Sequence, residues 1–519
     1  MANEATRGRV YPTPPTYHSF RGPSPWGVVA LVLCAVLAML FLSYFVLTFN
    51  PLMAIVVLAP FGLAVLLAVP AQNRSHTRAI TFGLLAFMVF VWSLWPQYGG
   101  IDVPGMPVLS LPKVLFYAIL VMTIWQLATS MVLRRELSSI VGNNKPVFVT
   151  LGVLLVCFLA STPLAYNMNI TTYELVQRIL FWFLPVIIAC VVINSRARIE
   201  MVISALVASV TLLSVLANIE AVQQENPYVR YWPAFLTISS EWTMIAQESR
   251  FRAGEYRVQG PFSHPLAMAE FVALCVPFVL YRLITARNFL MQVIYFGIVV
   301  TCVMAVLAAD SRSAQVAFLF EIALFIGLGL VRFQRFNPFS RYRVLVALFI
   351  AGGLAMGGPA ILAATAKIAK GDTASTAASS QHRIDQWKQA IPRIAASPVV
   401  GYGAGNALQV LGYRTFKNLT VDCYYINIVL DTGIPGLIAM VTLFGLLMYQ
   451  LFLRSYSRDG PEGHLLLALA CAIMGFAIVK LVLSIDANFP IFFMVCGTAL
   501  VALDLDRRGL LPHGSGPRS

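Results

Sequence analysis

Charged residues are scarce in this sequence. Asp, Glu, Lys and Arg make up 11% of its 519 residues, whereas roughly 25% is usual for a soluble domain. Hydrophobic residues make up 59%, and no stretch reads as a soluble domain. This scarcity excludes an ordinary soluble enzyme and predicts an integral membrane protein built as one large helical domain.

Cysteine pairs are also missing. Eight cysteines are present, but there is no Cys-x-x-Cys pair, and all except Cys423 fall inside apolar runs. A single cysteine in a predicted outside loop cannot form a disulfide within that loop. The sequence therefore predicts neither an intraloop disulfide nor a cysteine metal site.

The net charge of +14 is the one feature of the composition that could suggest a nucleic-acid partner. In a membrane protein, however, the excess of Lys and Arg usually lies in cytoplasmic loops and sets the orientation of the spans. We therefore expect no nucleic-acid partner.

Apolar runs recur along the whole chain, and a bilayer core about 30 Å thick needs about 20 apolar residues per helix. We predict an all-α polytopic membrane protein with about fourteen transmembrane helices. The runs are Val28–Phe49, Pro51–Pro70, Ala79–Trp95, Val114–Leu133, Val147–Ser161, Val176–Asn194, Ile199–Ala217, Pro265–Ile284, Phe289–Ala309, Ser313–Val331, Val344–Ala366, Leu437–Leu453, Leu465–Ser484 and Phe489–Leu505.

The basic residues predict the orientation of these spans. With the N-terminus in the cytoplasm, arginine-rich connections fall inside, whereas the short outside loops hold only Lys113, Arg178 and Arg312. This asymmetry is the positive-inside pattern. We expect cytoplasmic tails at residues 1–27 and 506–519, a transmembrane domain at residues 28–505, and an N-terminal segment that is not cleaved.

Two long extracytoplasmic loops follow from the same alternation, at residues 218–264 and 367–430, and both carry charge on the side where positive charge is normally depleted. The second loop contains Ile384, Trp387 and Ile391 at helical spacing, with charged residues around them. This pattern predicts a helix lying on the membrane surface. Pro392 should bend or shorten that helix.

Four outside sites stand out for their charged residues. They are Arg250, Arg252 and Arg257 leading into Gly260–Pro265; Asp310–Ser313 between two spans; Arg383 on the surface helix; and Asp422 before Tyr424 and Tyr425. Several arginines at this depth suit a lipid-linked phosphate or pyrophosphate, because guanidinium binds phosphate oxygens bidentately and stays charged.

Such an ensemble fits glycosyl transfer from a polyprenyl diphosphate. The leaving group is already good, so the protein must stabilise the departing negative charge and deprotonate an incoming hydroxyl. Arginines can do the first and a carboxylate or histidine the second, without any metal or cofactor. The predicted catalytic residues are Asp422, Arg312, Arg257 and Arg383. The predicted substrate-binding residues are Arg252, His264, Tyr425 and Trp387.

Each candidate also has a structural alternative. Arg257 could anchor the following helix at the head groups, and Arg312 could pair with the acid beside it. Arg383 could belong to the solvated face of the surface helix. His264 stands before a proline where a span begins, a position that favours a structural role. Asp422 could be the N-cap of the segment that follows it.

Charges inside predicted spans are further candidates. Glu270 and Glu321 lie within spans, and Lys480 lies near the outer end of another. Intramembrane charges are functional candidates by default, but they can equally pair inside the helix bundle. We discount the acidic pair Asp504 and Asp506, because the predicted topology places it inside, away from the other sites.

Four stretches together resemble the bacterial O-antigen ligase and polysaccharide polymerase superfamily. They are Arg257-x-x-Gly260-Pro261-Phe262-x-His264-Pro265; Ser311-Arg312-Ser313; Arg383-x3-Trp387 through Ser397-Pro398-x2-Gly401-Tyr402-Gly403; and Asp422-x2-Tyr425 through Asp431-Thr432-Gly433-Ile434-Pro435-Gly436-Leu437. They cover roughly residues 250–437 and share one predicted side of the membrane. The resemblance implies a multispan enzyme that acts on undecaprenyl-diphosphate-linked glycans at the outer face of the inner membrane.

The resemblance also implies roles for single residues. Arg257 and Arg312 match family arginines assigned to the diphosphate. The ligase branch typically has a histidine where this chain has Asp422, nine residues before the acidic position that Asp431 occupies. An aspartate could still accept a proton, and members with this departure look more like polymerases or exopolysaccharide-type enzymes.

The resemblance and the outside charge predict a glycan polymerase of the bacterial inner membrane with its active site facing the periplasm. It would transfer an undecaprenyl-diphosphate-linked oligosaccharide to a hydroxyl of another lipid-linked repeat. Expected partners are this lipid-linked glycan, membrane lipid and other polysaccharide-assembly proteins such as a flippase or a chain-length regulator. The alternatives are a ligase that transfers glycan to a lipid core or protein, and a flippase or transporter, which should show a polar midplane pathway.

Overall fold

The computed structural model describes residues 78–100, 110–232, 237–238, 251–252, 255–333, 373–415, 418–458 and 460–510. Contacts divide the chain into two units, Met1–Ala64 and Val65–Ser519. All of the described residues lie in the second unit, so the architecture below is that of residues 65–519. The predicted spans Val28–Phe49, Pro51–Pro70 and Val344–Ala366 fall outside the described residues.

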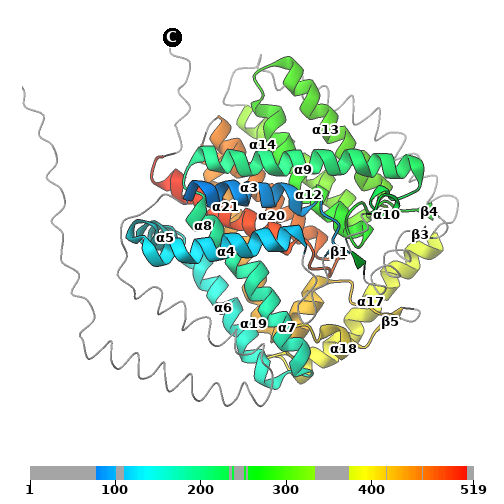
Figure 1. Ribbon diagram of the computed structural model, residues 1–519. Coiled ribbons are helices and arrows are strands. Elements are labelled where there is room, and N and C mark those ends of the chain that lie inside the picture. The colour runs from blue at the N-terminus through cyan, green and yellow to red at the C-terminus, as the bar shows by residue number, and fades with distance from the viewer. Residues whose placement is uncertain are drawn as a thin grey trace, which may run out of the picture. The chain divides into compact units, whose positions relative to one another are not determined.

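Helices dominate the described residues (Figure 1). They are α3 (Arg78–Trp92), α4 (Leu111–Thr129), α5 (Met131–Asn143), α6 (Lys145–Ser161), η1 (Thr162–Leu164), α7 (Met168–Arg178), the π-helical η2 (Ile179–Phe183), α8 (Leu184–Val192), α9 (Arg196–Gln223), α10 (Pro227–Arg230), α12 (Pro265–Thr285), α13 (Phe289–Ala308), α14 (Arg312–Phe333), α17 (Thr373–Ala396), α18 (Ala407–Leu411), α19 (Tyr424–Ser457), α20 (Pro461–Val479) and α21 (Phe489–Arg507).

Nine helical segments within the described ranges are long and apolar enough to cross a membrane. They are Leu111–Thr129, Lys145–Leu164, Met168–Val192, Arg196–Gln223, Pro265–Thr285, Phe289–Ala308, Tyr424–Ser457, Pro461–Val479 and Phe489–Arg507. The shorter apolar helix α3 and the helix α14 coincide with two more predicted spans. A helical, multi-pass membrane protein is thereby confirmed, while the total of about fourteen spans stays a prediction.

Local sequence explains where several helices begin. Ser195 and Asn167 accept hydrogen bonds from backbone N–H groups in the first turns of α9 and α7, which satisfies donors that have no partner within the helix. Proline stands in the first turn of α4, α6 and α20, where its missing N–H costs nothing.

The centre of the unit is formed by α12, α20 and α21, whose apolar stretches are 89%, 78% and 100% buried. Aromatic rings fill the space around them: the Phe476 and Phe492 centroids are 3.9 Å apart, and those of Trp182 and Phe489 are 4.5 Å apart. By contrast, only 22% of the α13 stretch is buried. Its many outward apolar side chains are those of a helix that faces lipid.

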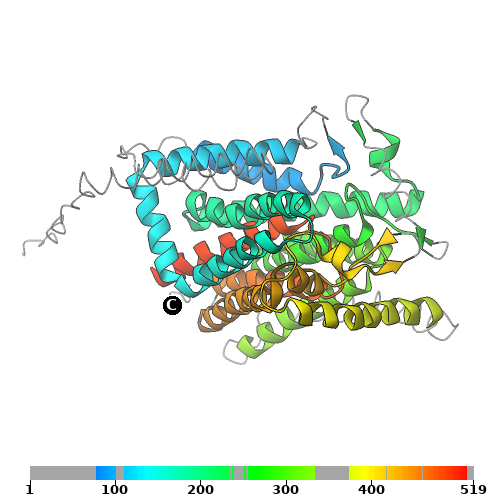
Figure 2. The same ribbon diagram turned by 90° about the horizontal axis from the view of Figure 1, so that it is seen from below.

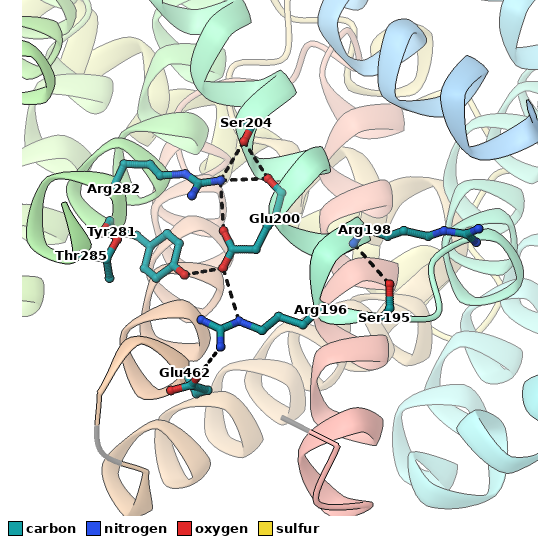
Figure 3. A network of polar contacts seen from close by, with 9 residues as sticks. All are labelled: Ser195, Arg196, Arg198, Glu200, Ser204, Tyr281, Arg282, Thr285 and Glu462. Carbon is teal, nitrogen blue, oxygen red and sulfur yellow. Dashed lines mark hydrogen bonds and ion pairs between the residues drawn. The ribbon is translucent and has the colours of Figure 1, made fainter. Parts of the chain in front are cut away.

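One end of the helices is held by ion pairs, and we name it the basic end. Arg196 pairs with Glu462, while Glu200 accepts a hydrogen bond from the Tyr281 hydroxyl at 2.5 Å and pairs with Arg282 at 3.0 Å. These contacts join α9, α12 and α20 (Figure 3). The arginines involved are among those that the topology prediction places in the cytoplasm.

The acidic pair that we discounted also lies at the basic end. Asp506 pairs with Arg454 and Arg458 at 3.2 and 2.7 Å, and Asp504 accepts a hydrogen bond from Asn143 at 2.6 Å. These contacts tie α21 to α19 and α5 and give both acids a structural role.

The opposite end, which we name the loop end, carries three pairs of two-residue antiparallel strands (Figure 2). The strands are β1 (Gly99–Gly100) with β2 (Thr237–Ile238), β3 (Phe251–Arg252) with β4 (Glu255–Tyr256), and β5 (Arg414–Thr415) with β6 (Asn418–Leu419). In register, Gly99 faces Ile238, Phe251 faces Tyr256, and Arg414 faces Leu419. The connections that hold the four motif stretches lie at this end.

The surface helix predicted in the second long loop is α17, and it differs from expectation at Pro392. The helix runs past this proline to Ala396, so Pro392 does not shorten it, and the alternative that it bends the helix stays a prediction. One side of α17, at Ala390 and Ile394, packs on α18 and α19. This packing outweighs the one backbone hydrogen bond that a proline removes near a helix end.

The start of α19 is the second difference. The chain becomes helical at Tyr424 rather than at Leu437, and Gly433 breaks the helix with φ 74° and ψ −177°. A Cβ on Gly433 would lie 2.5 Å from the carbonyl carbon of Val399. The Gly433-Ile434-Pro435 signal therefore marks an interruption within one long helix, with Pro435 in the first turn of its second half.

Candidate functional site

Arg257 links two predicted site segments at the loop end, the start of α12 and the turn between α13 and α14. We name Arg257, His264 and Arg312 the arginine group. Arg257 is 7% exposed; its Nε donates to the carbonyl of Ala309 at 3.0 Å, and its Nη2 donates to the carbonyl of Asp310 at 3.4 Å. Arg257 thus holds the α13–α14 turn.

Arg312 is exposed and is the first residue of α14. It follows Asp310, which adopts φ 48°, an unusual backbone conformation for a residue other than glycine. The contacts from Arg257 support this turn through its carbonyl groups. The side chain of Arg312 is therefore presented from a held backbone, as a residue that binds an anionic group requires.

His264 is the N-cap of α12: its Nδ1 accepts a hydrogen bond from the backbone N–H of Leu266 at 3.1 Å. Burial lowers its pKa to about 4, and the positive charge of Arg257 acts in the same direction. A neutral ring that accepts through Nδ1 carries its proton on Nε2. The structural role that the sequence favoured for His264 is present, and a neutral imidazole of this kind can donate only one hydrogen bond to a ligand.

The second group of predicted residues lies between α17 and the start of α19. We name Arg383, Gln386 and Asp422 the aspartate group. The backbone N–H of Asp422 donates to Gln386 Oε1 at 2.9 Å. Gln386 is fully buried, and its Nε2 donates to Thr420 Oγ1 at 3.3 Å. Sequence reasoning missed Gln386, although it is three residues from Arg383 on one helix face.

The carboxyl group of Asp422 has a raised pKa. Burial is the main cause, and the charges of Arg383 and His382 and a hydrogen bond with Gln386 act against it. The N-cap of α19 is Cys423, so the alternative that Asp422 caps this helix is wrong. The Nε of Arg383 is buried and has no hydrogen-bond partner in the protein, which leaves it a donor for a ligand or water.

His382 and Tyr413 lie next to the aspartate group. The two side chains share a hydrogen bond of 2.6 Å between His382 Nδ1 and the Tyr413 hydroxyl. Tyr413 stands directly before β5, so the contact ties that strand pair to α17. The negative charges of Asp385 and Asp422 add to burial in raising the pKa of Tyr413.

The remaining predicted binding residues are placed differently. The hydroxyl of Tyr425 donates to the carbonyl of Ala477 at 2.9 Å and so joins α19 to α20. Trp387 is 39% exposed on the outer side of α17, away from the buried Gln386. Arg252 lies in β3.

A buried ion pair between α7 and α19 was not predicted. Arg178 was expected in a short outside loop, but it is only 2% exposed and its Nη2 lies 2.6 Å from Asp431 Oδ2. Asp431 also accepts hydrogen bonds from the backbone N–H groups of Gly405 and Ala407 at 2.9 and 3.0 Å. The pair therefore anchors the glycine-rich turn at residues 401–405 to the helix break at Gly433.

An apolar pocket of about 580 Å³ lies between α6 and α19 beside the same turn. Its lining includes Val153, Val399, Ile434 and Ile438. Within the described residues, no three His, Cys, Asp or Glu side chains are placed to hold a metal ion.

A comparison with protein families gives one match, which covers part of this site. The family model described as O-antigen ligase matches residues 297–441, a segment that contains Arg312, Arg383, Asp422 and Asp431. Arg257 and His264 lie before the match. No curated protein matches the chain.

The fold and the match together describe the class: a multi-pass membrane protein in which residues 297–441 match the family model described as O-antigen ligase. The resemblance to the O-antigen ligase and polymerase superfamily, which we derived from four short stretches, is thereby confirmed. The match supports glycosyl transfer of the ligase or polymerase type in general.

Proposed function

We propose that this protein is a glycan polymerase of the bacterial inner membrane. It would transfer an oligosaccharide from undecaprenyl diphosphate to a hydroxyl of another lipid-linked repeat unit at the periplasmic face. The observation that carries the proposal is the match at residues 297–441, because this segment contains Arg312, Arg383 and Asp422 at one end of the helix bundle.

In this proposal the arginine group binds the donor diphosphate. Arg312 is exposed at the start of α14, and Arg257 holds the turn before it through two backbone carbonyl groups. Guanidinium groups stabilise the negative charge that grows on the diphosphate as the bond to the sugar breaks. The unpartnered Nε of Arg383 is a further donor for this charge.

Asp422 is the proposed general base. It takes the proton of the acceptor hydroxyl, whose oxygen forms the new bond to the anomeric carbon while the bond to the diphosphate oxygen breaks. Burial raises the pKa of Asp422, and a carboxylate with a raised pKa is a stronger proton acceptor at neutral pH. Arg383 still favours the charged form, which a base needs before the reaction.

The choice of polymerase over ligase depends on Asp422, since the resemblance gives ligases a histidine at this position. The ligase is the second candidate, because the family that matches is described as O-antigen ligase. It would transfer glycan to a lipid core or to protein. A reaction with both acceptors present distinguishes the two, because only a polymerase lengthens the lipid-linked chain.

The proposal is tested by measuring chain growth on purified lipid-linked repeats. We expect Arg312→Ala and Asp422→Asn each to lower the rate roughly 100-fold or more. Lys388→Ala is the matched control, because Lys388 lies on the exposed side of α17 with a side chain 69% exposed, and we expect it to keep the wild-type rate. Full chain growth by Arg312→Ala and Asp422→Asn would show that the site is assigned wrongly.

A further inference from the structure

A buried ion pair joins α12 to the end of α20. The Nζ of Lys480 lies 2.8 Å from Oε1 of Glu270, and both side chains are 0% exposed. The ammonium group also lies over the rings of Phe489 and Phe476, at 4.5 and 4.8 Å from their centroids, and donates to the carbonyl of Ile485. Two of the three charges noted as intramembrane candidates, Glu270 and Lys480, are therefore engaged with each other.

Stability alone explains such a pair poorly. Taking two charges out of water costs several kcal/mol per ion, and replacing a buried pair by apolar side chains of similar volume is often neutral or stabilising. A pair that is retained in an apolar surrounding is better explained by the geometry that it imposes. The question is then which segments Glu270 and Lys480 hold in place.

From Glu270, hydrogen bonds lead to the arginine group. Asn488 Nδ2 donates to Oε2 of Glu270 at 2.8 Å and to the carbonyl of Ala267 at 2.8 Å. Ala267 lies in the first turn of α12, which His264 caps. The segment that starts at Arg257 leads into α12 at this cap. The ion pair and Asn488 therefore hold the first turn of α12, which directly follows that segment.

From Lys480, hydrogen bonds lead to the aspartate group. The backbone N–H of Tyr424 donates to the carbonyl of Lys480 at 3.0 Å. Four residues further along, the hydroxyl of Ser484 donates to the carbonyl of Val421. Val421 and Tyr424 stand on either side of Asp422, so the backbone around the proposed base is attached to the loop that follows Lys480.

We propose that Glu270 and Lys480 form a positioning pair that fixes the aspartate group relative to the arginine group. The inference rests on the function proposed above, because it concerns the same transfer reaction. The two groups come from segments far apart in the sequence, yet the reaction needs the base and the diphosphate ligands around one substrate. Without the pair, the loop after Lys480 is released and Asp422 moves with it.

The decisive variant is the apolar double substitution Glu270→Leu with Lys480→Met. It removes both charges at once and keeps the volume, so we expect a folded protein with a thermal midpoint at or above that of the wild type. We also expect kcat for chain growth to fall roughly 10- to 100-fold, because a misplacement of about 1 Å can cost about 100-fold. KM for the lipid-linked donor should stay within about threefold, because Arg257 keeps its hydrogen bonds to the α13–α14 turn and His264 keeps its cap on α12.

Glu462→Gln is the matched control. It breaks the pair with Arg196 at the basic end of the same helix α20 (Figure 3), at the opposite end of this helix from Lys480. We expect a lower thermal midpoint and an unchanged kcat. Glu270→Gln is the second variant: it keeps the shape of the side chain and removes its charge, and we expect the same fall in kcat.

A double variant, or Glu270→Gln, that folds and retains the wild-type kcat would overturn the positioning role and leave the pair as packing. Failure of the positioning role can be distinguished from failure of the polymerase proposal. If the wild type transfers glycan to a lipid core or protein acceptor instead of extending chains, the polymerase assignment fails, and the same comparison of kcat is then made on that reaction.

Discussion

At the scale of single residues, the site depends on how burial and charge act on Asp422. Burial raises its pKa. The charges of Arg383 and His382 lower it, and so does a hydrogen bond with Gln386. A base must be deprotonated to act, so activity should fall at acidic pH as Asp422 takes up a proton. The acid limb of the rate profile should therefore lie above the usual pKa of an aspartate, about 3.9.

Arg383→Gln tests this electrostatic account. Removing the positive charge removes an influence that favours the carboxylate, so the pKa of Asp422 rises further. We expect the acid limb of the kcat/KM profile to move to higher pH, with the larger loss of rate at acidic pH. Lys388→Ala, which removes an exposed charge on the same helix, should leave the limb in place; an unmoved limb in Arg383→Gln would show that Asp422 is not the titrating base.

Sequence reasoning found the polar residues of the site but not their partners. Arg257, Arg312, Arg383 and Asp422 could be named because charge on the outside of a membrane protein is unusual. Their contacts with backbone carbonyl groups and with Gln386 depend on which helices neighbour each other. Apolar periodicity gives the spans but does not give these neighbours.

At the scale of elements, the break in α19 is the feature that shapes the site. Gly433 takes φ 74°, and the backbone of Val399 lies against it. The glycine-rich turn at residues 401–405 follows Val399 and is anchored through Gly405 to Asp431, which pairs with Arg178. Turn residues in a sequence are usually taken as the end of a helix, which is why the sequence placed the start of this span at Leu437.

Gly433→Ala tests the role of the break. The added Cβ would meet the carbonyl carbon of Val399 at 2.5 Å, and alanine is strained at this φ. We expect a loss of at least about 2 kcal/mol of stability, measured as a lower thermal midpoint in detergent. Gly445→Ala in the same helix has open space around the added atom and should be neutral or stabilising by about 0.5–1 kcal/mol; equal midpoints for the two variants would contradict this account.

At the scale of the whole molecule, the helices separate two chemistries. The basic end holds arginine–acid pairs such as Arg282 with Glu200, and the loop end holds the motif stretches. Spans within the described residues were predicted well because hydrophobic runs of this length have few alternatives. The side chains that link the spans could not be predicted in the same way.

The orientation of the two ends can be measured with single cysteines. We expect Lys388→Cys, on the exposed side of α17, to react with a membrane-impermeant maleimide in intact spheroplasts. Arg287→Cys, in the exposed connection between α12 and α13, should react only after the membrane is permeabilised. The reverse pattern would place the proposed active site in the cytoplasm.

The central claim is that this protein lengthens lipid-linked glycan and that Asp422 is its base. The most direct test is the length distribution of lipid-linked and surface glycan in a deletion strain that carries either the wild type or Asp422→Asn. We predict that single repeats accumulate on the lipid carrier in the deletion strain and with Asp422→Asn, and that only the wild type restores long chains. Chains of normal length left on the carrier in the deletion strain would contradict the polymerase and indicate a ligase.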